Sequence, residues 1–160
     1  MVQKAVVIMG SNSDIPFCNK IKESLDQLRI PTELRIASAH RHPEFLLRML
    51  REYSKSGDEI VVVTVAGLSD ALSGVVAAQR LFPVIACPPD LEKYGSEKVF
   101  SSAFTPSDVP VAFVNDPSKA ANLVAQIFAL TNHTLSQQIT SKLEEKKKQI
   151  EKMDDEQRKA

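Results

Sequence analysis

Five short segments have the apolar, β-branched character of strands, and each is followed by residues that favour turns. These segments are Ala5–Met9, Glu33–Ala37, Ile60–Ala66, Pro83–Cys87 and Pro110–Val114. Most of them are continuous apolar runs, which are typical of strands buried on both faces of a parallel sheet. The pattern therefore predicts a sheet of about five strands.

The segments between these strands carry apolar residues at helical spacing. The spacing predicts helices over residues 15–28, from Pro43 to a C-terminal stop at Gly57, over residues 71–81 and from Pro117 to Leu130. Residues 90–108 are mostly polar, and we expect a long loop there with a short helix near 97–104. Alternating strands and helices of this kind predict an α/β fold, a doubly wound parallel sheet with helices on both faces in three layers.

The chain changes character at His133. Its last part is rich in Lys and Glu, with a thin helical stripe of apolar residues at Leu135, Ile139, Leu143, Ile150 and Met153. Such a helix is typical of a solvated or partner-bound arm. We therefore expect a core domain over 1–131 and a C-terminal helical extension over 132–160, with disorder in 154–160.

Composition excludes several classes of function. The 20 basic and 20 acidic residues cancel, which argues against a large nucleic-acid footprint but not against one anionic ligand. Cys18 and Cys87 are too few for a disulfide framework or a metal ligand set. No apolar run has membrane-spanning length and no signal peptide is evident, so we expect a cytoplasmic protein without membrane contact.

Polar side chains follow each of the first three predicted strands. They lie in the loops Gly10–Asp14, Ser38–Arg41 and Gly67–Asp70. Taken alone, each loop can be interpreted either as part of a ligand site or as an ordinary strand-to-helix connection with polar surface residues. Because parallel strands end at one edge of the sheet, the three loops can converge there, where open α/β sheets bind ligands.

The first two loops have the chemistry of an anion site. The first lacks the glycines of a dinucleotide fingerprint and the lysine of a P-loop. Its backbone N–H groups and the Ser11 and Ser13 hydroxyls nevertheless suit a phosphate, and Arg41 can add a bidentate contact. Asp14 would repel a phosphate, so we expect it to bind ribose hydroxyls. The alternative is that Asp14 only caps the next helix, a role that Ser13 could also fill.

His40 is the candidate for proton transfer. An imidazole accepts and donates protons near neutral pH. His42 precedes a proline and His133 follows the core, so both are interpreted as structural or surface residues. The sequence shows no hydrolase triad order and no metal-ligand spacing, and we expect no metal and no cofactor.

Two of these loops together resemble one known family. The segments Ile8-Met9-Gly10-Ser11-Asn12-Ser13-Asp14 and Ser38-Ala39-His40-Arg41 are similar to motifs of the PurE family, the phosphoribosylaminoimidazole carboxylases and mutases of purine biosynthesis. The resemblance covers Val6 to about Leu130. It implies a flavodoxin-like fold, a homo-oligomer that is usually an octamer, active sites between subunits, and C-terminal helices that reach neighbouring subunits.

The third loop bears on the class within this family. Class I rearranges N5-carboxyaminoimidazole ribonucleotide and usually has Ala-Gly-Gly-Ala-Ala-His-Leu-Pro-Gly. Class II carboxylates aminoimidazole ribonucleotide with CO2 and has Ala-Gly-Arg-Ser-Asn-Ala-Leu-Ser-Gly. This chain reads Ala66-Gly67-Leu68-Ser69-Asp70-Ala71-Leu72-Ser73-Gly74, which is similar to class II. It departs from class II at Leu68, where that class has arginine, and at Arg41, where lysine is common.

The resemblance implies a role for each matching residue. It implies that His40 is catalytic and removes the C4 proton of aminoimidazole ribonucleotide, and that residues 67–73 shape the CO2 pocket. The substrate-binding set comprises Gly10, Ser11, Ser13, Asp14, Ser38, Ala39, Arg41, Gly67, Ser69, Asp70 and Ser73.

Other functions stay open from the sequence. The class I mutase reaction is one, and a non-catalytic ribonucleotide-binding module of flavodoxin type is another. A family member that acts on a pyridinium nucleotide in nickel-pincer cofactor synthesis fits less well, since those carboxylases usually carry an extra N-terminal region.

Overall fold

The structure, a computed structural model, describes residues 1–159, except for the side chain of Ser96. It divides into two compact units, Met1–Val124 and Ala125–Ala160. The expected boundary after residue 131 stays a prediction.

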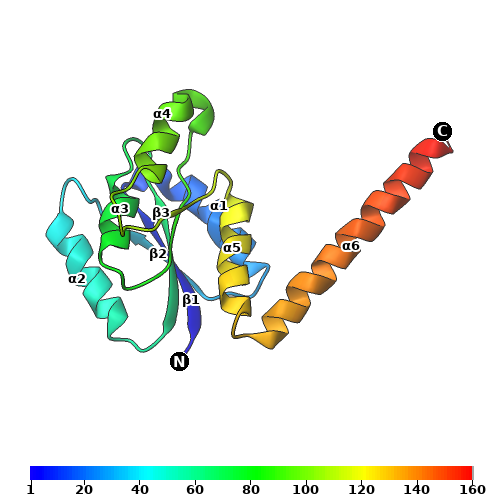
Figure 1. Ribbon diagram of the computed structural model, residues 1–160, viewed down its shortest axis with the longest axis horizontal. Coiled ribbons are helices and arrows are strands. Elements are labelled where there is room, and N and C mark those ends of the chain that lie inside the picture. The colour runs from blue at the N-terminus through cyan, green and yellow to red at the C-terminus, as the bar shows by residue number, and fades with distance from the viewer. Residues whose placement is uncertain (160) are drawn as a thin grey trace. The chain divides into compact units, whose positions relative to one another are not determined.

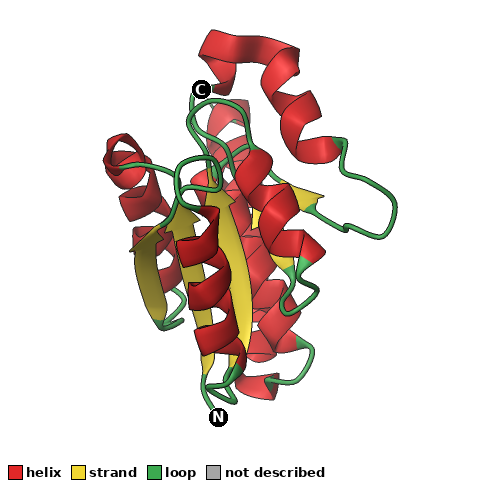
Figure 2. Cartoon of the chain, turned by 90° about the vertical axis from the view of Figure 1, so that its left-hand side faces the viewer, coloured by secondary structure: helices red, strands yellow, loops and turns green. Residues whose placement is uncertain are grey.

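The first unit is built on a five-stranded parallel sheet in the order β2-β1-β3-β4-β5. The strands are β1 (Gln3–Met9), β2 (Thr32–Ile36), β3 (Glu59–Val65), β4 (Val84–Ala86) and β5 (Ala112–Phe113). This order is the flavodoxin-like one and confirms the predicted fold class. In Figure 2 the strand arrows point the same way, with helices in front of the sheet and behind it.

Helices cover both faces of this sheet. They are α1 (Ile15–Asp26), which follows the short 3-10 turn η1 (Asn12–Asp14), α2 (Pro43–Ser54), α3 (Ala71–Ala78), α4 (Leu91–Ala103) and α5 (Pro117–Ala129), of which the first unit holds residues up to Val124. Figure 1 shows α2 and α3 on one face, α1 and α5 on the other, and α4 beyond the carboxyl ends of the strands.

The core explains why the apolar runs are continuous in the central strands. Five successive residues of β1 and six of β3 are buried. Side chains alternate along a strand, so Val6 and Ile8 pack toward α2 and α3, while Val7 and Met9 face the α1 side. Edge strand β2 is half-buried along most of its length, which accounts for its partial alternation. Cys18 and Cys87 are buried free thiols, and burial raises the pKa of each to about 12.

The structure corrects the expectation for residues 90–108. Instead of a loop with one short helix, α4 occupies Leu91–Ala103 with a break at Gly95, where φ is 60° and ψ −147°. Glycine adopts this left-handed region without the steric cost of a side chain. Two helical segments, joined at Gly95, therefore form where the polar composition predicted irregular chain.

Two smaller expectations also differ from the structure. The cap of the first turn is Ser11, whose side chain accepts from the Ser13 N–H, whereas Asp14 makes no side-chain cap bond at α1. The region expected to be disordered is helical as far as Arg158 in α6 (His133–Arg158). Its last turns contain a 3.8 Å ion pair between Lys152 and Glu156, at the i, i+4 spacing that stabilises helices. Ala160 lies outside the described residues.

A partly buried polar cluster joins β1, β2 and α2. The Tyr53 hydroxyl donates to Glu33 and accepts from Arg35 at 2.8 Å, and Lys4 contacts Glu33 at 2.9 Å. The Tyr53 hydroxyl and the Lys4 ammonium lower the pKa of Glu33. A lowered folded-state pKa stabilises the protein above the unfolded pKa, which is about 4.3 for Glu, and this contribution is lost as pH falls through the folded value.

We predict that Tyr53→Phe lowers the free energy of unfolding by about 1.5–2 kcal/mol at pH 7, the lower part of the range for a hydrogen bond to a charged group, because the bond is only partly buried. The loss should be smaller at pH 3 than at pH 7, because protonation of Glu33 increases as the pH falls and a neutral carboxyl group accepts a weaker bond. Urea denaturation at both pH values measures it, with Tyr94→Phe as the control that removes the chain's other tyrosine hydroxyl. An equal loss at both pH values would contradict the assignment to ionised Glu33.

Candidate active site

The strand order creates a crevice at the carboxyl end of β1, because the chain adds β2 on one side of this strand and the later strands on the other. β2 lies on one side of β1, and β3 with the later strands lies on the other. Loops that leave the carboxyl ends of β1 and β3 therefore turn apart, and ligands of doubly wound sheets bind at this point. The three polar loops expected from the sequence follow β1, β2 and β3.

A cavity of about 240 Å³ lies at this point, and it brings the three loops together. Its lining consists of Gly10, Ser11, Ser13, Asp14, Ser38, Ala39, His40, Arg41, Ala66, Gly67, Leu68, Ser69 and Leu72. Ten of the twelve residues expected in the site from the sequence are in this lining. The exceptions are Asp70 and Ser73.

The β1 loop presents two hydroxyls next to a buried carboxylate. The Ser11 and Ser13 hydroxyls are 2.8 Å apart. Asp14 is 5% exposed, and burial raises its pKa, an effect that the nearby Lys98 ammonium opposes. The carboxyl group is thus held at the floor of the cavity, within reach of neutral hydroxyl donors on a ligand.

The β2 loop is a tight turn that places His40 and Arg41 at the cavity. The Arg41 N–H donates to the Ser38 hydroxyl at 3.2 Å, and the His42 N–H donates to the Ser38 carbonyl at 3.1 Å. His40 and Arg41 are exposed, so both can reach a ligand. His42 instead lies 3.3 Å from Glu44 and outside the cavity lining, as the sequence suggested.

The β3 loop approaches Asp14 so closely that it needs a glycine. A Cβ at Gly67 would lie 2.8 Å from the Asp14 Oδ1 atom, closer than real Cβ contacts. Gly10 is less constrained, because the nearest atom to a Cβ there is 4.0 Å away. The glycine at position 67 therefore serves close contact between the two loops.

Asp70 and Ser73 lie outside the cavity lining, and the buried Ser73 hydroxyl has no hydrogen-bond partner among the described residues. Asp70 caps α3 by accepting from the Ser73 N–H at 3.0 Å, and it also accepts from the Ser102 hydroxyl at 2.7 Å. Ser73 is fully buried. Their expected role in substrate binding stays a prediction.

Sequence reasoning missed Lys98. This residue of α4 is 4% exposed, and its ammonium donates to the Gly67 carbonyl at 2.8 Å. One lysine among 20 basic residues gives no signal in the sequence, and residues 90–108 were expected to be mostly loop. Only the path of α4 brings it to the β3 loop.

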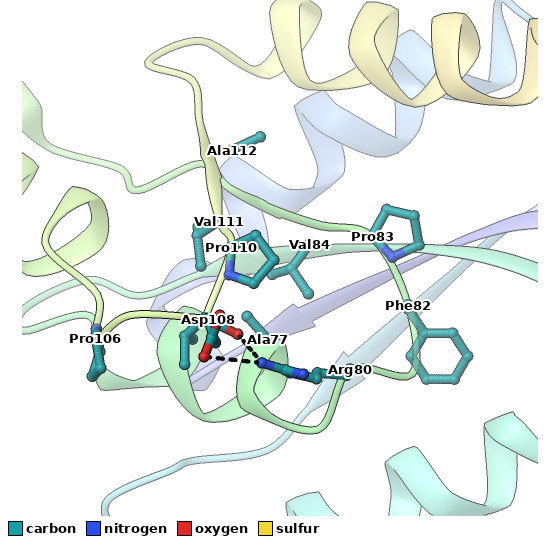
Figure 3. A pocket seen from close by; sticks show the side chains of 11 residues that line it. Ala77, Arg80, Phe82, Pro83, Val84, Pro106, Asp108, Pro110, Val111 and Ala112 are labelled. Atoms are coloured by element: carbon teal, nitrogen blue, oxygen red, sulfur yellow. Dashed lines mark hydrogen bonds and ion pairs between the residues drawn. The ribbon is translucent and has the colours of Figure 1, made fainter.

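A larger cavity of about 960 Å³ lies elsewhere, between the end of α3, β4 and the segment before β5. Figure 3 shows it lined largely by prolines and apolar side chains, with Arg80 bonded to Asp108 at its rim. It has no histidine, cysteine or serine in its lining. The smaller polar cavity is therefore the candidate active site. Among residues 1–159, no group of three or more His, Cys, Asp or Glu side chains is placed to hold a metal ion.

The arrangement can bind an anionic, hydroxyl-bearing molecule and move one proton. Hydroxyls, backbone N–H groups and the Arg41 guanidinium suit a phosphate, Asp14 suits a ribose, and the His40 imidazole is a general acid or base.

No helix of the described chain is both long and apolar enough to cross a membrane.

Comparison with known proteins gives one consistent family. Residues 4–150 match the family described as AIR carboxylase. The chain is 44% identical to a phosphoribosylaminoimidazole carboxylase of Archaeoglobus fulgidus over 96% of its own length and 84% of the relative. It is 42% identical to a bifunctional phosphoribosylaminoimidazole carboxylase/phosphoribosylaminoimidazole succinocarboxamide synthetase of Mus musculus, of which it spans 31%.

Solved structures agree with this result. A crystal structure of a Treponema denticola PurE2 variant superimposes with a TM-score of 0.93 at 33% identity, covering 98% of both chains. The crystal structure of Treponema denticola PurE gives a TM-score of 0.86 at 34% identity, covering 91% of this chain and 92% of that one. Because both its sequence and its fold match, this chain belongs to the AIR carboxylase (PurE) family.

Proposed function

We propose that the protein carboxylates 5-aminoimidazole ribonucleotide with CO2 to give 4-carboxy-5-aminoimidazole ribonucleotide, a carboxy-lyase reaction of purine biosynthesis. The observation that carries the proposal is the position of His40 in one cavity with the phosphate- and ribose-binding groups and the β3 loop. The names of the Archaeoglobus fulgidus and Treponema denticola relatives, both phosphoribosylaminoimidazole carboxylases, support it.

The β3 loop favours carbon dioxide as the second substrate. Ala71 and Ser73 stand where the class I pattern has histidine and proline. Ala66, Gly67 and Leu72 give this side of the cavity a small and partly apolar wall, which suits a neutral, linear molecule. The homo-octamer and the cytoplasmic location expected from the resemblance stay predictions.

The proposed reaction needs positioning and one proton transfer. The ribonucleotide C4 is the carbon end of an enamine, and its electron pair forms a C–C bond to CO2 while a C=O electron pair moves onto oxygen. After this step, C4 carries both its original hydrogen and the new carboxylate group. His40 removes that proton, the ring regains aromaticity, and the proton passes from the imidazole to solvent. Fixing both reactants in one cavity contributes several kcal/mol toward the barrier.

The reaction class is tested with the wild-type protein in two parallel assays. One supplies aminoimidazole ribonucleotide with varied bicarbonate and no ATP, and the other supplies N5-carboxyaminoimidazole ribonucleotide. Turnover that requires the free amine and CO2 is the expected result. Turnover with the N5-carboxy compound alone would replace the carboxylase by the mutase, and turnover with neither would favour a non-catalytic binding module.

We predict that His40→Asn lowers kcat for carboxylation by on the order of 10²-fold or more, because the C4 proton loses its base. The Kd for aminoimidazole ribonucleotide, measured by calorimetry, should stay within about threefold, since asparagine keeps a polar side chain at the cavity. His42→Asn is the matched control, as this histidine lies outside the lining. Near-normal turnover in His40→Asn would remove His40 from the mechanism.

We predict that Gly67→Ala raises KM for the ribonucleotide by about tenfold or more, because the added methyl group displaces the Asp14 carboxylate from the ribose. Gly10→Ala is the comparison, since its Cβ has ordinary contact distance. Steady-state kinetics measures both variants. A larger effect at Gly10 than at Gly67 would contradict the close approach of the β1 and β3 loops.

A further inference from the structure

Lys98 is a buried cation that joins two loops at the carboxyl edge of the sheet. Its Nζ donates to the Gly67 carbonyl, after β3, at 2.8 Å and to the Pro89 carbonyl, after β4. It also lies 5.2 Å from the centre of the Tyr94 ring. A buried ammonium is costly unless it is hydrogen-bonded and offset by opposite charge, so this placement requires compensation.

Three carboxylates provide that compensation. Asp14 lies before α1, Asp70 at the start of α3 and Asp90 before α4, and all three favour the charged form of Lys98. Burial acts in the opposite direction and lowers the Lys98 pKa. The ammonium thus lies at the point where the acidic groups of three elements converge.

Gly67 connects Lys98 to the candidate active site. Its carbonyl is bonded to the Lys98 ammonium, and its Cα lies so close to Asp14 that no side chain fits between them. A shift of the Gly67 backbone would therefore open or close the space that the Asp14 carboxylate occupies. Among the described residues that line the cavity, Arg41 of the β2 loop is the one lysine or arginine, so Lys98 supplies its charge from behind the lining.

We propose that Lys98 is a positioning residue of the active site, whose ammonium fixes the Gly67 carbonyl and thereby holds the Asp14 carboxylate in place for the ribose hydroxyls. The inference rests on the proposed function, since it takes the ribose of a ribonucleotide as the group that Asp14 binds. Lys98 does not line the cavity, so it acts through Gly67 and Asp14.

Lys98 also affects the ionisation of Asp14. Burial and Asp90 raise the Asp14 pKa, whereas Lys98 and a hydrogen bond from the Ser11 backbone lower it. Cys18 is close enough to interact with Asp14, and His40 and Arg41 line the same cavity. Loss of the Lys98 charge therefore raises the Asp14 pKa, and the carboxylate becomes protonated at a higher pH.

The test is Lys98→Met in the full-length chain, with Lys93→Met as the matched control on the same helix. Lys93 is exposed, so its loss should change neither KM nor the pH profile. For Lys98→Met we expect KM for aminoimidazole ribonucleotide to rise about tenfold with kcat within about threefold, as for a lost charged hydrogen bond. The acid limb of the kcat/KM profile should move to higher pH.

Lys98→Arg and Lys98→Gln separate charge from packing. Arginine keeps the positive charge and should return the acid limb toward its wild-type position. Glutamine can still donate to a carbonyl but has no charge, so the acid limb should stay shifted, and this variant replaces Lys98→Met if the methionine protein does not fold. A purely structural role would lower the melting temperature without moving the acid limb, and that result would overturn the proposal.

Ribonucleotide affinity, measured by calorimetry, separates this inference from the proposed function. Wild-type turnover with unchanged affinity and pH profile in the folded Lys98 variants would overturn the role of Lys98 and leave the carboxylase intact. No wild-type turnover, but weaker ribonucleotide binding in Lys98→Met than in Lys93→Met, would overturn the carboxylase and support the role of Lys98 in binding.

Discussion

The pairing of β1 with β3 is the constraint on which the rest of the structure depends. Seven residue pairs join the two strands, from Gln3 beside Glu59 to Met9 beside Val65, and the Gly10 N–H extends the ladder to Val65. Both strands are buried on both faces, so a shift in register would turn each side chain toward the opposite helix layer and disrupt its packing. Because the register is held, the loops after β1 and β3 leave the sheet at the same level, and Gly67 can meet Asp14.

The electrostatics of the site follow from this close contact. A carboxylate that is 5% exposed and a lysine that is 4% exposed lie on opposite sides of one glycine. Each group is costly to bury alone, and each reduces the cost of burying the other. Arg41 and His40, by contrast, lie on an exposed turn. The site thus combines buried charged groups with polar groups that remain accessible to a ligand.

The β3 loop holds one of the two positions at which this chain departs from the class II pattern that it resembles. Leu68 stands where the class II pattern has arginine, and it is 69% exposed at the cavity lining. The loop nevertheless contacts a cation, because the buried Lys98 ammonium donates a hydrogen bond to the Gly67 carbonyl. Within the described residues, α4 and the β3 loop therefore belong to one structural unit, which is further tied by the bond between Ser102 and Asp70.

The sequence by itself determined the strands, their parallel arrangement and ten of the residues in the cavity lining. These features are local, since continuous apolar runs report burial on both faces and strand ends in a parallel sheet share one edge. Only the tertiary structure decided that α4 forms around a break at Gly95, that Asp70 is bonded to Ser102, and that Lys98 reaches Gly67. These contacts join residues about 30 positions apart, and the partner of a buried charge depends on the packing of the chain, which residue spacing does not encode.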